Sequence, residues 1–184
     1  MKKRCTWAKD SLNVIYHDEE WGNPQHDDKK LFEFLILEGA QAGLSWSTIL
    51  KRRNGYKNAF SNFDACAVSE YTQKHVQKIL QDKSVIRNKL KINSAINNAK
   101  QFLKIQNEFG SFDEYLWSFV NHTPIQNKFK KHSDIPTSTE ISEKLSNDLK
   151  KRGFSFVGPT ICYALMQAVG LVNDHTTDCF RYTK

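Results

Sequence analysis

Two predicted helices are joined by the stretch Lys150-Lys151-Arg152-Gly153-Phe154-Ser155-Phe156-Val157-Gly158-Pro159-Thr160. Gly153 can adopt the left-handed backbone conformation that ends a helix, and Pro159 suits the first turn of the next helix. Three apolar residues between them, Phe154, Phe156 and Val157, are able to hold this short link against the core. We therefore predict a helical hairpin at this point of the chain.

The hairpin has the features of a phosphate-binding element. The backbone N–H groups of Gly158 and Thr160 are expected to face outward at a helix N-terminus, where the helix dipole favours an anion. Lys150, Lys151 and Arg152 place three positive charges immediately before it. An ordinary tight turn between two packed helices explains the same residues equally well, so the residues alone leave both interpretations open.

Helical periodicity extends outward from the hairpin. The segment Thr137-Ser138-Thr139-Glu140 is a capping box that opens the first hairpin helix, with Ile141, Leu145 and Leu149 facing inward. The hairpin element therefore covers about residues 138–169.

Five further helices are predicted upstream of the hairpin element. They run from the caps Asp27 and Asp28 to about Gly39, from Ser45 toward Arg53, near residues 69–81, over roughly residues 88–109 up to Gly110, and from Ser111 through Phe119. Residues 120–136 are predicted as a loop. Because strand-like alternation is almost absent, we predict an all-α fold and a single domain over residues 1–184.

Composition is that of an ordinary globular protein. The chain has 184 residues, enough for one sizeable core, and 39% of them are hydrophobic and 26% charged. No apolar run approaches the 18 residues of a membrane span, and the basic N-terminus lacks the apolar stretch of a signal peptide. We expect a cytoplasmic monomer without membrane contact, whose four cysteines form no disulfide framework.

Charge is distributed unevenly along the chain. Residues 1–50 contain 6 Lys and Arg against 8 Asp and Glu, whereas residues 51–184 contain 21 against 12. The basic residues cluster at Lys51-Arg52-Arg53, Arg87 to Lys91, Lys128 to Lys131 and Lys150-Lys151-Arg152. A basic face beside a mildly acidic portion suits a polyanion such as nucleic acid, although solvated helix surfaces would look similar.

Two pairs of residues near opposite ends of the chain are candidate metal ligands. His175 and Cys179 are four residues apart, a spacing that brings both side chains to one ion across a helical turn. Cys5 and His17 offer a second pair, although their interval is not a standard zinc-finger spacing. Two thiolates and two imidazoles suit tetrahedral zinc, but single histidines are more often ordinary surface or core residues.

The other two cysteines, Cys66 and Cys162, lie in apolar helical settings and are predicted as core residues. With all four positions filled by protein, a site at Cys5, His17, His175 and Cys179 would be structural. It would join the two ends of the chain and leave no position for a reacting water.

The densest unusual stretches are Tyr16 to Gly22 and Leu37 to Trp46. Glu38 follows a strongly apolar run, so we expect it to be at least partly buried and to have a partner. Candidate walls for a flat ligand are the aromatic residues Trp7, Tyr16, Trp21 and Trp46. The alternatives are a structural or helix-capping role for Glu38 and a plain core role for the tryptophans.

These stretches resemble bacterial 3-methyladenine DNA glycosylase I, the constitutive enzyme of the helix–hairpin–helix glycosylase superfamily. The resemblance runs from Cys5 to Cys179 and is carried by Tyr16 to Gly22 with Pro24, Leu37 to Trp46, Ile86-Arg87, Lys91-Ile92, Trp117 to Val120, Leu149 to Gly158 and Val172 to His175. It implies a helix–hairpin–helix fold and one structural zinc per chain at the four Cys and His residues.

The resemblance also implies a base-flipping site. In this family the flipped base lies against an aromatic ring, here Trp46, with Trp7 and Trp21 as further walls and Glu38 and Tyr16 at its polar edge. Three residues would approach the gap left in the duplex: Gln41, Gly43 and Leu44, the last as an apolar wedge. Hairpin contacts to double-stranded DNA are expected at Lys150, Lys151, Gly153, Gly158 and Thr160.

The implied reaction is hydrolytic release of 3-methyladenine from alkylated DNA, with 3-methylguanine as a second candidate substrate. Pro159-Thr160 stand where many bifunctional relatives place a lysine nucleophile, so no lyase activity is expected. Asn173 takes the position of an aspartate used by many relatives, and we assign Asp174 no catalytic role. Glu38 is the best catalytic candidate, acting through recognition and electrostatics.

Two other functions fit parts of the sequence. A non-catalytic, zinc-containing DNA-binding module would need the hairpin and the metal but not the pocket of Glu38, Tyr16 and Trp46. A glycosylase for other lesions, such as 3-methylguanine alone or oxidised bases, would need a pocket of different specificity.

Overall fold

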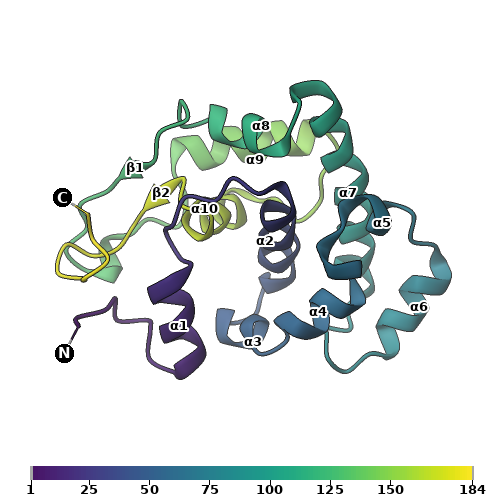
Figure 1. Cartoon of the computed structure of the whole chain (residues 1–184), viewed down its shortest axis with the longest axis horizontal. Helices are drawn as coiled ribbons and strands as arrows, with labels where there is room; N and C mark the ends of the chain where they lie inside the picture. Colours follow the sequence, from purple (N-terminus) through teal and green to yellow (C-terminus); the bar gives the residue numbers. More distant parts are fainter. Residues whose placement is uncertain (1, 184) are drawn as a thin grey trace.

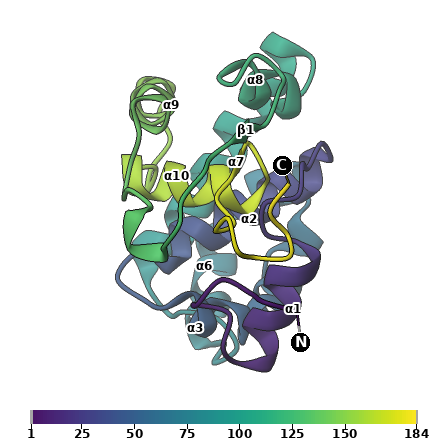
Figure 2. The ribbon, with the colours of Figure 1, turned by 90° about the vertical axis from the view of Figure 1, so that its left-hand side faces the viewer.

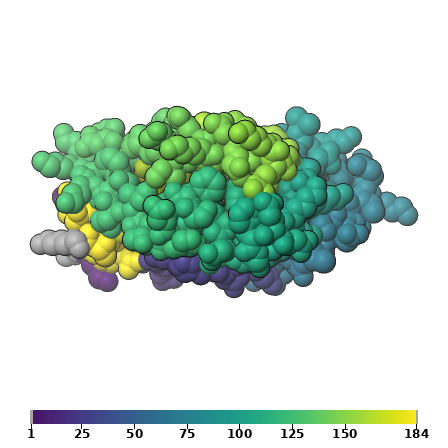
Figure 3. Space-filling view, turned by 90° about the horizontal axis from the view of Figure 1, so that it is seen from above, coloured from purple at the N-terminus to yellow at the C-terminus, as the bar shows by residue number. Residues whose placement is uncertain are grey.

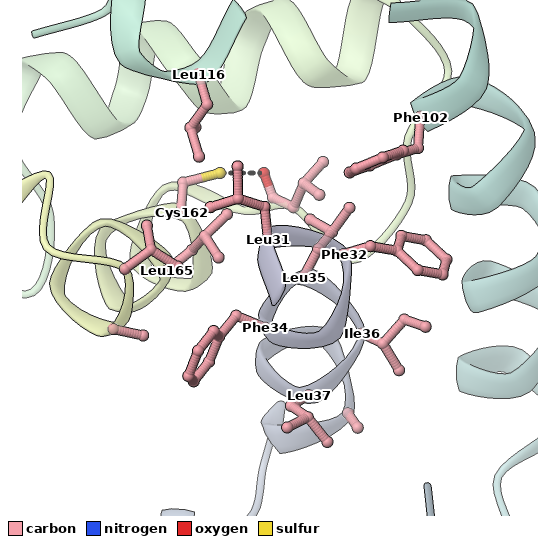
Figure 4. Close-up of a cluster of buried hydrophobic side chains, with 14 of the residues drawn as sticks. Leu31, Phe32, Phe34, Leu35, Ile36, Leu37, Phe102, Leu116, Cys162 and Leu165 are labelled. Atoms are coloured by element: carbon pink, nitrogen blue, oxygen red, sulfur yellow. Dashed lines mark hydrogen bonds between the residues drawn. The ribbon is translucent and has the colours of Figure 1, made fainter. Parts of the chain in front are cut away.

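The second helix, α2 (Asp28–Gln41), is buried on nearly every side, and the other helices pack around it. In the computed structural model, which describes residues 2–183, every residue from Leu31 to Ala40 is buried. Figure 4 shows its apolar side chains pointing outward all around the helix, toward Phe102 of α7, Leu116 of α8, and Cys162 and Leu165 of α10. A helix that is apolar on all sides must lie inside the fold.

The elements around α2 are mostly helical (Figure 1). They are α1 (Ser11–Glu19), α3 (Trp46–Leu50), α4 (Arg53–Ala59), α5 (Ala65–Ser69), α6 (Gln73–Gln81), α7 (Lys89–Phe109), α8 (Phe112–Ser118), α9 (Glu140–Lys151), α10 (Pro159–Ala168), the 3-10 turns η1 (Ser61–Phe63) and η2 (His132–Asp134), and two short strands, β1 (Ile125–Gln126) and β2 (Val172–Asn173). The predicted helical fold is therefore confirmed. Within residues 2–183, no helix is both long and apolar enough to cross a bilayer.

The two ends of the chain lie on the same side of the molecule. Figures 1 and 2 show the N-terminal segment and α1 beside the C-terminal segment that follows β2, and Figure 3 shows the segment around α6 at the opposite end. Strand β1 pairs in parallel with β2, in the register Ile125 to Val172 and Gln126 to Asn173. This pair fastens the long connection between α8 and α9 to the C-terminal segment.

Helix caps placed from the sequence are confirmed at three N-termini. The side chains of Asp27, Ser45 and Ser111 accept hydrogen bonds from backbone N–H groups at the starts of α2, α3 and α8. The long helix α7 begins after Asn88 and ends at Gly110, as its periodicity predicted.

Four details of the predicted elements are wrong. The capping box of α9 pairs Thr139 with Ser142, two residues later than the one expected between Thr137 and Glu140. The segment from Ser45 toward Arg53 ends at Leu50, and a separate α4 starts at Arg53. The helix predicted over residues 69–81 is divided between the end of α5 and α6. Residues 120–136, predicted as a loop, contain β1 and η2. Both elements are too short to give a periodic pattern in the sequence.

The hairpin between α9 and α10 has the predicted backbone and is held by α7. Gly153 has a φ of +89°, and Pro159 is the first residue of α10. Asn98 of α7 binds both backbone groups of Ser155: its Oδ1 accepts from the N–H at 2.9 Å and its Nδ2 donates to the carbonyl at 2.9 Å. Phe154 and Val157 are buried, whereas Phe156 is half-buried. Asn98 therefore attaches the middle of the link to α7.

Candidate functional site

A cavity of about 280 Å³ opens beside the C-terminal half of α2. Its walls are Trp7, Tyr16, Trp21, Glu38, Gln41, Trp46, His132, Ala164 and Gln167. The five residues predicted from the sequence to surround a flat ligand are all among them. The fold brings them together because α1, α2 and α3 converge here on α10.

Glu38 is the one carboxyl group in the wall of this cavity, and it has no partner among residues 2–183. Its side chain is only 4% exposed, yet no hydrogen bond or ion pair reaches it from residues 2–183. Burial alone raises its pKa to about 8. The expected protein partner is therefore absent in the described chain, because the α2 surface that carries Glu38 faces the cavity.

Aromatic rings form the walls around Glu38. The ring of Tyr16 lies 5.1 Å from that of Trp46, and Trp7 meets Trp21 edge-on at 5.0 Å between centroids. Burial and the nearby Glu38 raise the pKa of the Tyr16 hydroxyl. The indole Nε1 of Trp46 is buried without a hydrogen-bond partner. The cavity thus combines flat aromatic surfaces with an unpaired carboxyl group.

Asp174 lies behind the cavity and is fully occupied by structural hydrogen bonds. Its carboxylate accepts from the Tyr163 hydroxyl at 2.6 Å, from Gln167 at 2.8 Å and from Asn127 at 2.6 Å, and it is 1% exposed. One of these donors, Gln167, lines the cavity. Asp174 therefore fixes a wall of the cavity and offers no free oxygen to a ligand.

The four predicted metal ligands meet in one buried cluster. Cys5, His17, His175 and Cys179 each present one ligand atom, and these atoms all lie within 4.8 Å of one another. The Sγ atom of Cys179 is 3.4 Å from Nε2 of His17 and 3.5 Å from Nδ1 of His175, and Sγ of Cys5 is 3.6 Å from the same Nδ1. The cluster has the donors and the size to hold a metal ion.

The outer nitrogens of both histidines have partners. Nδ1 of His17 lies 2.8 Å from Asp18, which is itself bound by Arg4, and Nε2 of His175 lies 3.1 Å from the carbonyl oxygen of Trp21. Such partners orient metal-ligating imidazoles. Burial lowers the pKa of His175 to about 4, which favours the neutral ring that a metal requires.

Two expectations about the cysteines and histidines are wrong. His175 and Cys179 lie in the turn after β2 rather than on a helix, and the turn is closed by the Cys179 N–H donating to the Thr176 carbonyl at 2.7 Å. Cys66 is exposed on α5, because the helix turns its other face inward, whereas Cys162 is buried as predicted.

Comparison with known proteins gives the family. The model of the methyladenine glycosylase family matches residues 6–182. The chain belongs to this family. It is 49% identical to the DNA-3-methyladenine glycosylase 1 of Escherichia coli K12 over 98% of this chain and 97% of that protein.

Solved structures agree over the whole fold. A crystal structure of a 3-methyladenine DNA glycosylase I superposes with a TM-score of 0.96 at 46% identity, covering 98% of this chain and 100% of the other. The Staphylococcus aureus enzyme, solved to describe its recognition of 3-methyladenine, gives a TM-score of 0.95 at 36% identity, covering 98% and 97% of the two chains.

A second cavity of this methyladenine glycosylase, about 200 Å³, continues from the first. It shares Glu38, Gln41 and Ala164 with the first cavity and is completed by Ala42, Gly43, Leu44, Thr160 and Ile161. Gly43 has a φ of +76°, and Leu44 is 39% exposed despite its apolar side chain. The turn after α2 therefore projects an apolar residue beside the start of α10.

Lys91 of α7 binds the end of α2 immediately before this turn. Its ammonium group donates to the carbonyl oxygens of Ala40 at 2.8 Å and Ala42 at 2.5 Å, at the C-terminus of α2. A cation at the C-terminus of a helix binds free carbonyl groups and interacts favourably with the helix dipole. Lys91 thus fixes the position of Gly43 and Leu44 relative to Glu38.

The charge before the hairpin is smaller than the sequence suggested. Arg152 binds Asp148 at 2.6 Å and Glu108 at 2.7 Å, so its charge is neutralised within the protein. Lys150 and Lys151 are exposed and form no ion pair with residues 2–183. Two lysines, not three cations, are therefore available near Gly153, Gly158 and Thr160.

Three wall residues of the first cavity were not found from the sequence: His132, Ala164 and Gln167. Ala164 and Gln167 are three residues apart on α10, so they share a face. That spacing was the only available signal, and it is equally typical of a core helix. His132 lies in the long connection between α8 and α9, which the pairing of β1 with β2 attaches to the C-terminal segment.

The raised pKa of Glu38 predicts a particular dependence of stability on pH. Between the ordinary pKa of 4.5 and the folded value of about 8, the folded protein holds a proton that the unfolded chain has released. The free energy of unfolding should therefore fall as pH rises through this interval, by up to about 1.4 kcal/mol per pH unit from this group.

Urea unfolding of the wild type and Glu38→Gln at pH 5, 6.5 and 8 measures this dependence. The stability of Glu38→Gln relative to the wild type should rise steadily from pH 5 to pH 8. Glu33→Gln is the matched control on the same helix, because ion pairs with Arg53 and Lys30 lower the pKa of Glu33. The free energy of unfolding of Glu33→Gln should be lower than that of the wild type by the same amount at all three pH values. A constant difference for Glu38→Gln as well would contradict a partnerless buried carboxyl.

Proposed function

We propose that this chain is a single-domain, monomeric DNA glycosylase that releases 3-methyladenine from alkylated DNA by hydrolysis, with 3-methylguanine as a second candidate substrate. The observation that carries the proposal is the unpaired carboxyl of Glu38 inside an aromatic cavity. A DNA-binding module without catalytic activity would have no use for such a group. Membership of the methyladenine glycosylase family supports the same assignment.

Base recognition in this proposal depends on the walls of the first cavity. The flipped adenine stacks on Trp46, with Trp7 and Trp21 as further walls, and each stacking contact contributes roughly 1–3 kcal/mol. Glu38 and the Tyr16 hydroxyl face the polar edge of the base. Extrusion from the duplex costs a few kcal/mol and least for damaged bases, so the cavity selects bases that are already poorly paired.

The chemistry follows from the charge of the substrate. Alkylation at N3 makes the purine cationic, which weakens its bond to the sugar and lets the base leave as a neutral molecule. A cation beside Glu38 favours the carboxylate form and lowers the pKa that burial has raised. The carboxylate therefore gains most from the charged substrate and the charge developing in the transition state, and less from the neutral product.

Hydrolysis without lyase activity is consistent with the residues near the cavity. Pro159 and Thr160 occupy the position after the hairpin where a lysine nucleophile would stand, and Asp174 is saturated by three donors. Water is therefore the acceptor of the sugar, and the bond that breaks is the one between base and sugar.

DNA contacts in this proposal lie on both sides of the second cavity. Gln41, Gly43 and Leu44 approach the gap left by the flipped base, with Leu44 as the apolar wedge. Backbone N–H groups near Gly153, Gly158 and Thr160 bind phosphate, supported by the free charges of Lys150 and Lys151.

The metal in the Cys and His cluster is proposed to be one structural zinc. Zinc with bonds of about 2.3 Å to sulfur and about 2.05 Å to nitrogen places tetrahedral ligand atoms about 3.6 Å apart. The three S–N distances of 3.4, 3.5 and 3.6 Å match this value. All four positions come from the protein, so the ion would hold the ends of the chain together and take no part in hydrolysis.

Replacing Glu38 by Ala should strongly weaken recognition of the base while preserving the fold. A lost bidentate contact corresponds to roughly 1–3 kcal/mol, or about one to two powers of ten in excision rate and in affinity for the free base. Excision is measured by chromatography of bases released from methylated duplex DNA, and base affinity by tryptophan fluorescence.

Two variants complete this experiment. Glu38→Gln keeps the size but loses the charge and should be intermediate or nearly as impaired as Glu38→Ala. Glu33→Gln breaks ion pairs on the same helix outside the cavity, so it should lose stability but retain base affinity. A Glu38→Ala protein that binds and excises 3-methyladenine like the wild type would place the recognition site elsewhere.

Replacing Cys179 by Ala should remove the zinc and markedly lower the melting temperature. Structural zinc contributes roughly 10–16 kcal/mol in small peptides, which is comparable with the stability of a whole domain. Metal analysis should find about one zinc per wild-type chain and much less in the variant. Cys66→Ala, an exposed cysteine outside the cluster, is the control and should keep both metal and stability. Metal-free wild type together with a normal Cys179→Ala melting curve would reject the site.

A further inference from the structure

A third cavity, about 420 Å³ in volume, adjoins the base pocket at His132, which lines both. Its other walls come from the N-terminal segment, from the connection between β1 and α9, and from the turn after β2. We call it the cationic groove, and it consists of Lys3, Arg4, Thr6, Lys130, Lys131, His132, Ser133, Thr176 and Asp178. The proposed function leaves this groove without a role.

Only part of the positive charge in the groove is neutralised by the protein. Lys3 pairs with Asp178 at 2.6 Å, and Arg4 pairs with Asp18 at 2.8 Å. Lys130 and Lys131 are exposed and pair with no carboxylate of residues 2–183. Their ammonium groups are therefore free for an external anion.

The segment that carries these lysines is fixed in place. The Thr177 N–H donates to the Phe129 carbonyl at 2.9 Å, and the Asn127 N–H donates to the Asn173 carbonyl at 3.2 Å. The carboxylate of Asp134 accepts from the Lys131 N–H at 3.1 Å and so closes the turn of η2. The groove is thus preformed, which reduces the entropy lost on binding.

Helix α10 connects the second cavity to the base pocket, and His132 connects the base pocket to the cationic groove. Thr160 lines the second cavity beside the hairpin, Ala164 lines both the second cavity and the base pocket, and Gln167 lines the base pocket together with His132. In Figure 1, α10 starts at the link from α9 and ends toward β2. From Thr160 to Gln167 the helix rises about 10 Å. The cavity beside the hairpin and the cationic groove therefore meet the base pocket at different walls, the first at Glu38, Gln41 and Ala164 and the second at His132.

We propose that the cationic groove binds backbone phosphates of the damaged strand, on the side of the flipped nucleotide opposite the hairpin. This proposal rests on the proposed function. A strand rises 3.4 Å per nucleotide, so the rise of about 10 Å from Thr160 to Gln167 corresponds to roughly three nucleotides between the hairpin side and the base pocket. The cationic groove lies beyond the pocket, at His132. Lys130 and Lys131 bind the phosphates as point charges, and His132 at the rim lies where the backbone leaves the pocket.

Phosphate contacts on both sides of the flipped nucleotide would assist its rotation out of the duplex. With phosphates held on both sides, the nucleotide between them can rotate out while its neighbours stay in place. The electrostatic contacts then offset part of the cost of unstacking. The groove is expected to contribute to affinity for every duplex, and to act without reading sequence.

The test compares Lys130→Ala/Lys131→Ala with a matched double variant, Lys74→Ala/Lys78→Ala. The control removes the same charge from exposed lysines of α6, at the far end of the molecule (Figure 1). Affinity for a duplex with a central abasic-site analogue is measured from 50 to 200 mM salt. In a plot of log affinity against log salt concentration, the loss of two phosphate contacts should make the negative slope of the groove variant shallower by about 1.8. The control variant should keep the wild-type slope.

The position of the contact is tested with uncharged methylphosphonate linkages, placed one at a time along the damaged strand. In the wild type, a neutral linkage on one side of the lesion should weaken binding because it removes a phosphate contact of the cationic groove. A neutral linkage on the other side should weaken binding because it removes a contact of the hairpin. In Lys130→Ala/Lys131→Ala the groove-side linkages should cost nothing further, because their partner is already lost. Equal slopes for both double variants, or additive effects at every linkage, would overturn the groove assignment.

Fluorescence titration with free 3-methyladenine separates this proposal from the one on which it rests. The groove variant should bind the free base like the wild type, because Lys130 and Lys131 do not line the base pocket. A wild type that fails to bind the base would sink the proposed function. Loss of base binding only in the groove variant would show that these lysines support the pocket instead of holding DNA.

Discussion

The buried carboxyl of Glu38 is the constraint on which the architecture of the site depends. An ionisable group in an apolar interior is costly unless it is paired, and most proteins provide the partner themselves. Here α2 is buried from Leu31 to Ala40, and Glu38 lies on the part of its surface that faces the base pocket. The protein thus keeps an unfavourable group unpaired, which leaves its interaction energy available to a cationic ligand.

Several structural interactions converge on keeping that cavity in shape. Asp174 holds Gln167, and His175 of the metal-ligand cluster holds the carbonyl of Trp21, so two walls are fixed from the C-terminal segment. Lys91 holds the turn after α2 on the other side. A metal in the cluster would accordingly stabilise more than the chain ends, because the segment it fixes also carries the partners of the pocket.

Local signals explain which parts of the fold could be predicted from the sequence. Caps at Asp27, Ser45 and Ser111 and the backbone geometry of Gly153 and Pro159 depend on neighbouring residues, so composition and spacing were sufficient. The β1–β2 pair has two residues in each strand and gives no periodic pattern. The partner of Arg152 on α7, Glu108, lies 44 residues away, and no local rule indicates that it neutralises the arginine.

The same distinction applies to the candidate site. Residues up to Trp46 were found because they are dense in the sequence and because the family resemblance pointed to them, and the fold gathers them around one cavity. His132, Ala164 and Gln167 were missed, since only tertiary packing brings them to α2. The absence of a protein partner for Glu38 could not be read from the sequence, because it depends on what surrounds the side chain in three dimensions.

A direct measurement of the ionisation of Glu38 tests the central claim. Carboxyl carbon chemical shifts of protein labelled with carbon-13 glutamate, followed against pH and assigned with Glu38→Gln, give the pKa of this one group. The account predicts a value near 8 in the free protein and a clear decrease when DNA carrying a cationic, non-cleavable analogue of 3-methyladenine is bound. A pKa near the ordinary value of 4.5 in the free protein would contradict it, because the carboxyl would then have a partner or be open to water.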